Sequence, residues 1–198
     1  MQGAAMGVSR ALRITLTTVS LAIPVAAVAE PALGPSVYGG LSFHHTEPSG
    51  NRSGDSYGST GLSFGLDYQI PQSAVFSIVP FTALSLENSD NAASSRASVN
   101  NGVAALEGRV WYRSFFMGLH GGYYVQEVSY SDATRKGGGF GWGLSLGTKP
   151  SASLGAGLAE GTYVMVQIDH GKNLDVGPQP DADRDIKAFR LFMGYRFP

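Results

Sequence analysis

The most regular feature of the chain is the alternation of apolar residues with small or polar ones. In segment 139–148, Phe140, Trp142, Leu144 and Leu146 alternate with glycine or serine. Successive side chains of a β-strand point to opposite faces, so this pattern predicts a strand with one apolar face and one small-residue face.

Eight segments of the chain alternate in this way, and we predict that each is a β-strand. Each has about ten residues or more, the length that crosses a bilayer when a strand is tilted by roughly 45°. Pro80, inside the third segment, removes one donor from the hydrogen-bond ladder, so we expect a β-bulge there. The predicted strands are 36–45, 58–70, 74–87, 102–113, 115–130, 139–148, 160–171 and 186–197.

The connections between these segments differ in length in an ordered way. Long polar stretches, 46–57, 88–101, 131–138 and 173–185, follow the odd-numbered segments. The connections after the second and fourth segments are very short, whereas 149–159, after the sixth, is longer than this pattern requires. An even number of antiparallel strands, with long loops at one end and tight turns at the other, is typical of outer-membrane barrels.

The predicted fold class is all-β: an eight-stranded antiparallel up-and-down transmembrane β-barrel with a polar, side-chain-filled interior. A sheet spans hydrocarbon only when it closes, and eight strands leave an interior just wide enough for side chains. A soluble lipocalin-like barrel or sandwich would show the same alternation with its faces reversed. The loop pattern and the glycine-rich polar faces favour the membrane barrel.

Six charged residues fall on the faces that we assign to the barrel interior. A buried charge without a partner costs several kcal/mol, so we expect the three carboxylates to meet the three guanidinium groups or lumen water. This predicted lumen polar network consists of Asp67, Glu107, Arg109, Asp169, Arg190 and Arg196.

Residues 1–29 have the features of a secretory signal peptide. Arg10 and Arg13 precede an apolar run of about a dozen residues, which is shorter than the roughly 20 that span a bilayer as a helix. Ala27 and Ala29 form a small-x-small cleavage site. We therefore expect cleavage after Ala29, export, and a barrel domain over residues 30–198.

The composition excludes several classes of site and partner. The chain has no cysteine, which excludes a disulfide scaffold, a thiolate zinc site and a cysteine nucleophile. Its 14 basic and 15 acidic residues nearly balance, so nothing indicates a nucleic-acid partner.

The last predicted strand ends in Gly194, Tyr195, Arg196 and Phe197, which resembles the C-terminal assembly signal of bacterial outer-membrane β-barrels. It departs from that signal because Pro198 follows the final aromatic residue. With the signal peptide and the eight strands, the chain resembles small outer-membrane barrels of the OmpA/OmpX kind. The resemblance implies insertion into the bacterial outer membrane by its assembly machinery, both termini in the periplasm, four loops outside, and contact with outer-membrane lipids and lipopolysaccharide.

Candidate chemistry is sparse. Lipid A deacylases resemble this architecture and carry a His-x-Ser pair, but Lys172 stands where the serine would follow His170. Acyl transfer of that type needs a hydroxyl that the histidine deprotonates. His44 and His45 are adjacent on a strand and point to opposite faces, so they are poorly placed to share a metal ion. We expect no catalytic residue, no cofactor and no metal site.

Three functions remain open from the sequence. The first is a non-enzymatic outer-membrane protein with a structural or surface-interaction role, whose loops could contact an extracellular ligand. The second is a lipid A- or phospholipid-modifying enzyme that uses an unrecognised site. The third is a narrow pore for small solutes.

Overall fold

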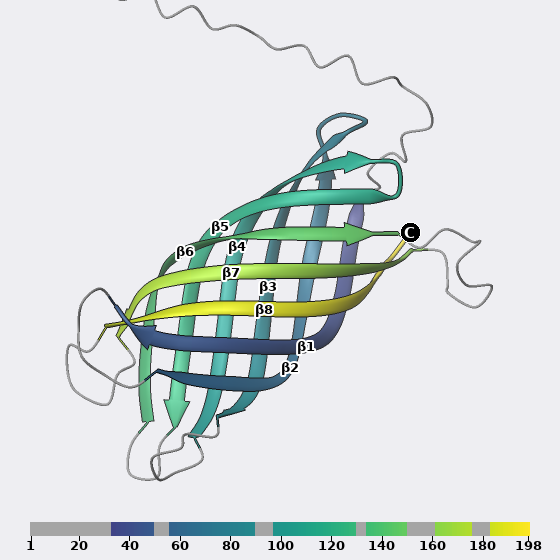
Figure 1. The fold of residues 1–198 in the computed structure, drawn as a ribbon. Helices are drawn as coiled ribbons and strands as arrows, with labels where there is room; N and C mark the ends of the chain where they lie inside the picture. The colour runs from purple at the N-terminus through teal and green to yellow at the C-terminus, as the bar shows by residue number, and fades with distance from the viewer. Residues whose placement is uncertain (1–32, 50–55, 90–96, 130–133, 150–160, 176–182) are drawn as a thin grey trace, which may run out of the picture.

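A computed structural model describes residues 33–49, 56–89, 97–129, 134–149, 161–175 and 183–198. Consecutive strands pair antiparallel, and the last strand pairs with the first, so the sheet closes into a barrel (Figure 1). This confirms the predicted fold class; the predicted signal peptide, residues 1–29, lies outside the described residues. The eight strands are β1 (Gly34–Pro48), β2 (Tyr57–Pro71), β3 (Phe76–Ser89), β4 (Ala97–Tyr112), β5 (Phe115–Ser129), β6 (Thr134–Thr148), β7 (Thr162–Asp175) and β8 (Asp183–Arg196).

The two ends of the barrel differ in their connections. One end of the barrel is here called the turn side. There, Arg113 and Ser114 join β4 to β5, and the last strand, β8, reaches its C-terminal end (Figure 1). At the other end, here called the loop side, the odd-numbered strands end. At the turn side, a backbone hydrogen bond joins the ends of the first and last strands: the Phe197 N–H donates to the Pro35 carbonyl at 3.0 Å.

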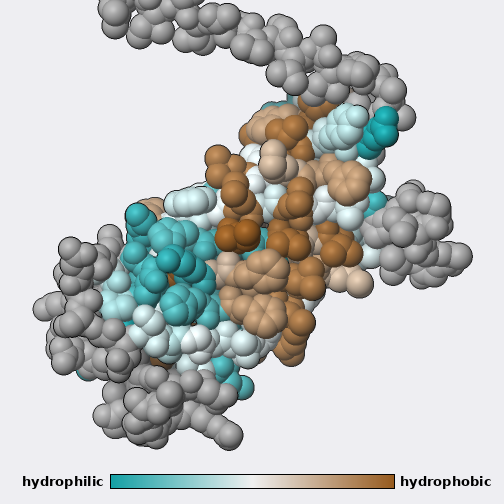
Figure 2. Space-filling model, viewed as in Figure 1, coloured by the Kyte–Doolittle hydropathy of each residue, from teal (hydrophilic) through white to brown (hydrophobic). Residues whose placement is uncertain are grey.

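The apolar faces of the strands point outward and the polar faces point inward. Leu144 is 45% exposed and Leu191 is 41% exposed, whereas Arg190 is 1% exposed and Glu107 is 2% exposed. Figure 2 shows the outward apolar residues as a broad band, with hydrophilic residues gathered toward the loop side. This polarity is the reverse of that of a soluble barrel, which would bury its apolar residues. Among the described residues, no helix is long and apolar enough to cross a membrane.

The strands continue beyond their predicted ends on the loop side. Much of the stretch 131–138 belongs to β6, where Lys136 pairs with Glu127 of β5. Much of 88–101 likewise belongs to β3 and β4, where Asn100 pairs with Leu86. The four predicted loops are therefore too long. Their polar composition indicated exposure to water, but backbone hydrogen bonds form a ladder without requiring apolar side chains.

Two local predictions on the turn-side half of the barrel are wrong. Pro80 produces no bulge: β3 keeps one register from Ile78 to Phe81 against β2, and Pro80 itself lies opposite Leu106 of β4. Its side chain is exposed on the outer face, where a ring is accommodated. The predicted strand 102–113 is one residue too long, because Arg113 lies exposed in the two-residue turn with φ of 55°.

The β1–β8 seam requires glycine at position 40. A Cβ atom on Gly40 would overlap the backbone carbonyl of Leu191, whereas a Cβ atom on neighbouring Gly39 would meet the Phe64 side chain at 3.3 Å and the Ser63 carbonyl oxygen at 3.8 Å. We expect Gly40→Ala to lower the free energy of unfolding by roughly 1–3 kcal/mol, the usual effect of overpacking. Urea titration of the barrel folded in lipid vesicles would measure the change.

Gly39→Ala is the matched control, and we expect it to change stability by less than about 0.5 kcal/mol. Equal stability of the two variants would show that the seam tolerates a side chain at position 40.

Candidate functional site

The lumen of the barrel holds the largest group of charged side chains in the described part of the chain. All six residues of the predicted lumen polar network lie there, and each is 5% exposed or less. They form two clusters, the Asp67 cluster near the turn side and the Asp169 cluster near the middle of the barrel.

The Asp67 cluster joins four of the predicted residues. Arg109 Nε contacts Glu107 Oε1 at 2.7 Å, and Arg109 Nη2 lies 3.7 Å from Asp67 Oδ2. Arg196 Nη2 lies 3.8 Å from Asp67 Oδ1. Ser145 of β6 donates its hydroxyl to Glu107 at 2.7 Å. Strands β2, β4, β6 and β8 are thus connected through the lumen.

The Asp169 cluster contains the other two predicted residues. Arg190 Nη1 contacts Asp169 Oδ2 at 2.5 Å. The Asp169 carboxylate also contacts His120 Nε2 at 2.8 Å, and accepts hydrogen bonds from Tyr124 at 2.8 Å and Gln167 at 2.9 Å. Four partners for one carboxylate compensate the loss of water around it.

Two residues that the sequence analysis did not assign to the network extend it toward the loop side. Arg190 Nη2 lies 3.2 Å from His44 Nε2, and His44 Nδ1 contacts the carboxylate of Glu87. Glu87 accepts further hydrogen bonds from Ser42 and Ser59, both at 2.6 Å. The alternation of β1 and β3 directs His44 and Glu87 inward, but no spacing in the sequence indicates that β1, β3 and β8 bring them together.

Aromatic and basic side chains close the turn side of the lumen. The Lys149 ammonium lies 4.8 Å from the centroid of Trp111, and the Arg196 guanidinium lies 6.0 Å from it. Burial, together with the positive charges of Arg196 and Arg109, lowers the pKa of Lys149. Trp111 donates its indole N–H to Ser77 of the neighbouring strand β3 at 3.1 Å, which fixes the orientation of the ring.

Several large side chains in the lumen lie over glycines of the neighbouring strand. In each pair the two residues are direct cross-strand partners, and the large side chain occupies the place that a Cβ atom would take. The glycines of the inward faces therefore make room for rings. The pairs are Tyr38 with Gly65, Phe116 with Gly147, His120 with Gly143, and Tyr163 with Gly194.

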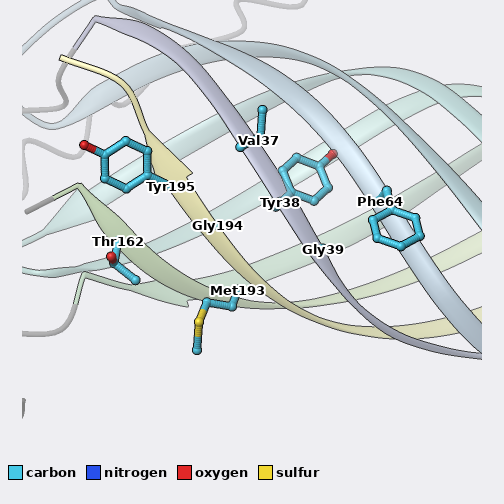
Figure 3. Close-up of a pocket in the computed structure, with 8 residues that line it drawn as sticks. All are labelled: Val37, Tyr38, Gly39, Phe64, Thr162, Met193, Gly194 and Tyr195. Carbon is cyan, nitrogen blue, oxygen red and sulfur yellow. The ribbon is translucent and has the colours of Figure 1, made fainter. Parts of the chain in front are cut away.

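The residues of the predicted assembly signal lie at the end of β8. Gly194 faces the lumen under the Tyr163 ring, whereas Tyr195 and Phe197 face outward with their ring centroids 5.3 Å apart. A shallow hollow of about 440 Å³ opens on the outer wall beside Tyr195, where Gly39 leaves space next to Phe64 (Figure 3). This placement is compatible with recognition from the membrane side; the signal role itself stays a prediction.

The wall of the barrel separates the candidate histidines from one another. His44 is 4% exposed in the lumen, and the His45 side chain is 52% exposed outside. His170 lies on the outer wall against Trp142, with 6.0 Å between ring centroids. Within the described ranges, no group of three or more His, Asp or Glu residues is arranged to hold a metal ion.

Solved structures with the same fold are small outer-membrane barrels. One is Ail, the attachment invasion locus protein of Yersinia pestis, in complex with the heparin analogue sucrose octasulfate: TM-score 0.57, 12% identity, 84% of this chain and 100% of Ail covered. Another is Neisserial surface protein A: TM-score 0.55, 10% identity, 83% of this chain and 97% of that chain covered. No protein-family model and no curated protein sequence matches the chain. At these identities, the likeness concerns the fold.

The Asp169 cluster supports a stability prediction. Asp169→Asn keeps the side-chain volume but leaves the buried Arg190 guanidinium without its nearest carboxylate. We expect a loss of about 3 kcal/mol, because breaking a buried ion pair leaves an uncompensated charge. Urea unfolding in lipid vesicles would measure it.

Glu127→Gln is the control, since it breaks the exposed Glu127–Lys136 ion pair on the outer face. Exposed pairs contribute less than about 1 kcal/mol. If the two variants were equally stable, the lumen charges would not hold the barrel together.

Proposed function

We propose that the protein is a non-enzymatic integral protein of the bacterial outer membrane, with a closed barrel as anchor and its loop side as a surface for interaction outside the cell. The observation that carries this proposal is the division of polarity across one wall. Leu106 is 57% exposed on the outer face of β4, while its neighbour Glu107 is 2% exposed in the lumen.

The membrane placement rests on hydrogen bonding and on the outer apolar band. A closed ladder leaves no unpaired strand edge, which hydrocarbon requires. The predicted signal peptide, with cleavage after Ala29, would deliver the chain to the periplasm. Insertion by the outer-membrane assembly machinery would follow, with Gly194, Tyr195 and Phe197 as the assembly signal. Lipids and lipopolysaccharide would then surround the band.

A role as an open pore is disfavoured by the filling of the lumen. Arg109 and Arg190 are each 1% exposed, and the Phe116 ring lies 4.3 Å from the Arg109 guanidinium. A water-filled channel would leave the side chains that line it accessible. The described lumen side chains instead contact one another.

A role as a lipid-modifying enzyme is disfavoured by the positions of the candidate groups. Asp169 and His120 resemble part of a catalytic triad in their 2.8 Å contact, but both are buried in the lumen, away from lipid. His170 faces lipid, and the position that would hold a serine nucleophile is Lys172. Nucleophilic acyl transfer needs a hydroxyl nucleophile and its histidine base on the same, lipid-facing side of the wall.

The interaction surface lies on the loop side, where the strands continue past the apolar band. The outward residues there are polar and charged, and exposed ion pairs join Lys187 with Glu47 and Lys136 with Glu127, both at 2.6 Å. Four strand connections extend from this end. An extracellular ligand would meet these connections and the charged strand ends first.

Expression in a Gram-negative host tests location and enzymatic activity on the same membranes. We expect the protein in the outer-membrane fraction, with faster gel migration before boiling than after, because the closed barrel stays compact in detergent. We also expect the mass spectrum of lipid A to match that of cells carrying an empty vector. Loss or gain of an acyl chain on lipid A would contradict the non-enzymatic assignment.

Planar-bilayer recording tests the closed lumen. We expect weak, irregular conductance from the purified barrel, because ion pairs and aromatic rings occupy its cross-section. The purified protein is unfolded and refolded, and the denaturant is removed before recording. A bilayer of lipid alone is the control. Large, steady single-channel currents would show that the protein is a pore.

A further inference from the structure

Three neighbouring strands carry a line of interfacial residues on the outer wall. Trp142 of β6 is the cross-strand partner of His170 of β7, and His170 is the partner of Lys187 of β8. Figure 2 shows hydrophilic side chains adjoining the apolar band on this side of the barrel. The next line of partners toward the turn side is fully apolar: Leu144, Ile168 and Phe189.

A pocket of about 320 Å³ opens where these two lines meet. We call it the interface pocket. It is lined by Trp142, Ile168, Asp169, His170, Lys172 and Lys187, and the Asp169 carboxylate points away from it into the lumen. Trp142 and Ile168 are 52% and 54% exposed and supply an apolar wall. The Trp142 ring lies against His170, with 6.0 Å between centroids, so its position is restrained.

The charged side of the interface pocket has an excess of positive charge. Lys187 is paired with Glu47 of β1 at 2.6 Å, and Glu47 also lies 3.8 Å from His45. No described residue forms an ion pair with Lys172, whose side chain is exposed. Among the described side chains, one carboxylate therefore lies beside two ammonium groups, and Lys172 is the ammonium group that forms no ion pair with them.

We propose that the interface pocket binds a phosphorylated acyl lipid of the membrane leaflet on the loop side, with its phosphate at Lys172 and Lys187 and an acyl chain along Trp142 and Ile168. This inference rests on the proposed membrane placement and names one lipid site within it. Ammonium groups attract anionic head groups, and indole rings prefer the boundary between head groups and hydrocarbon. The apolar wall favours a lipid over free phosphate, because a phosphate ion would make no apolar contact with Trp142 and Ile168.

The two tryptophans of the chain make this site measurable. Trp142 faces lipid, whereas Trp111 is 2% exposed in the lumen and is shielded from it. Bromine atoms on an acyl chain quench an indole on contact. The barrel would be folded into phosphatidylcholine vesicles with a minor fraction of brominated phosphatidylglycerol, or the same fraction of brominated phosphatidylcholine.

We expect stronger quenching of Trp142 by the anionic brominated lipid. The local enrichment should be about fivefold, which corresponds to about 1 kcal/mol for one lysine near a membrane surface. Lys172→Gln should remove most of the excess quenching. Glu47→Gln should increase it, because Lys187 then has no carboxylate partner on β1.

Lys136→Gln is the matched control: it removes a lysine from the outer face of β6 outside the interface pocket. We expect it to leave the excess quenching unchanged. Equal quenching by the two brominated lipids, or an excess that survives Lys172→Gln, would overturn the lipid site while leaving the membrane placement intact. Absence of quenching by either lipid would overturn the membrane placement itself, and the site with it.

Discussion

The structure depends on one constraint: every backbone N–H and C=O group that meets hydrocarbon must find its hydrogen-bond partner within the protein. A sheet satisfies this only by closing, and β8 does so by pairing with β1 from Ser36 opposite Arg196 to Pro48 opposite Arg184. Closure in turn separates two environments by the thickness of one sheet. Because neighbouring residues of a strand point to opposite sides, the apolar band outside and the charged lumen inside arise from the same alternation.

The number of strands then determines what the lumen can contain. Eight strands enclose a space that side chains fill, so each ring on one strand needs a small residue beside it. Tyr163 over Gly194 and Phe116 over Gly147 are examples. Charges in such a space are stable only when they are paired, and Asp169 with its four partners meets this requirement.

Because the charged side chains of the lumen polar network are buried, the exposed side chains of the barrel lie on its outer wall and at its ends. The outward side chains are apolar within the band. Where the strands continue past the band toward the loop side, the outward side chains include aromatic, basic and acidic residues. There, Trp142 and Lys187 lie on either side of His170, and Glu47 balances part of the positive charge. The boundary between band and loop side therefore combines an apolar wall with charge, which is the combination that amphipathic lipids recognise.

The sequence by itself determined the strand count, the two faces of each strand, and the inward position of all six charges of the lumen polar network. It did not determine that Arg109 contacts Glu107 while Arg190 contacts Asp169 and His44, because those contacts depend on the register and curvature that closure imposes. Arg190 and His44 are 146 residues apart in the chain, and no local pattern records that distance. Tertiary structure also decided where the strands end and that β3 contains Pro80 without a bulge. The reason is that cross-strand pairing, and not the composition of one segment, decides where a ladder stops.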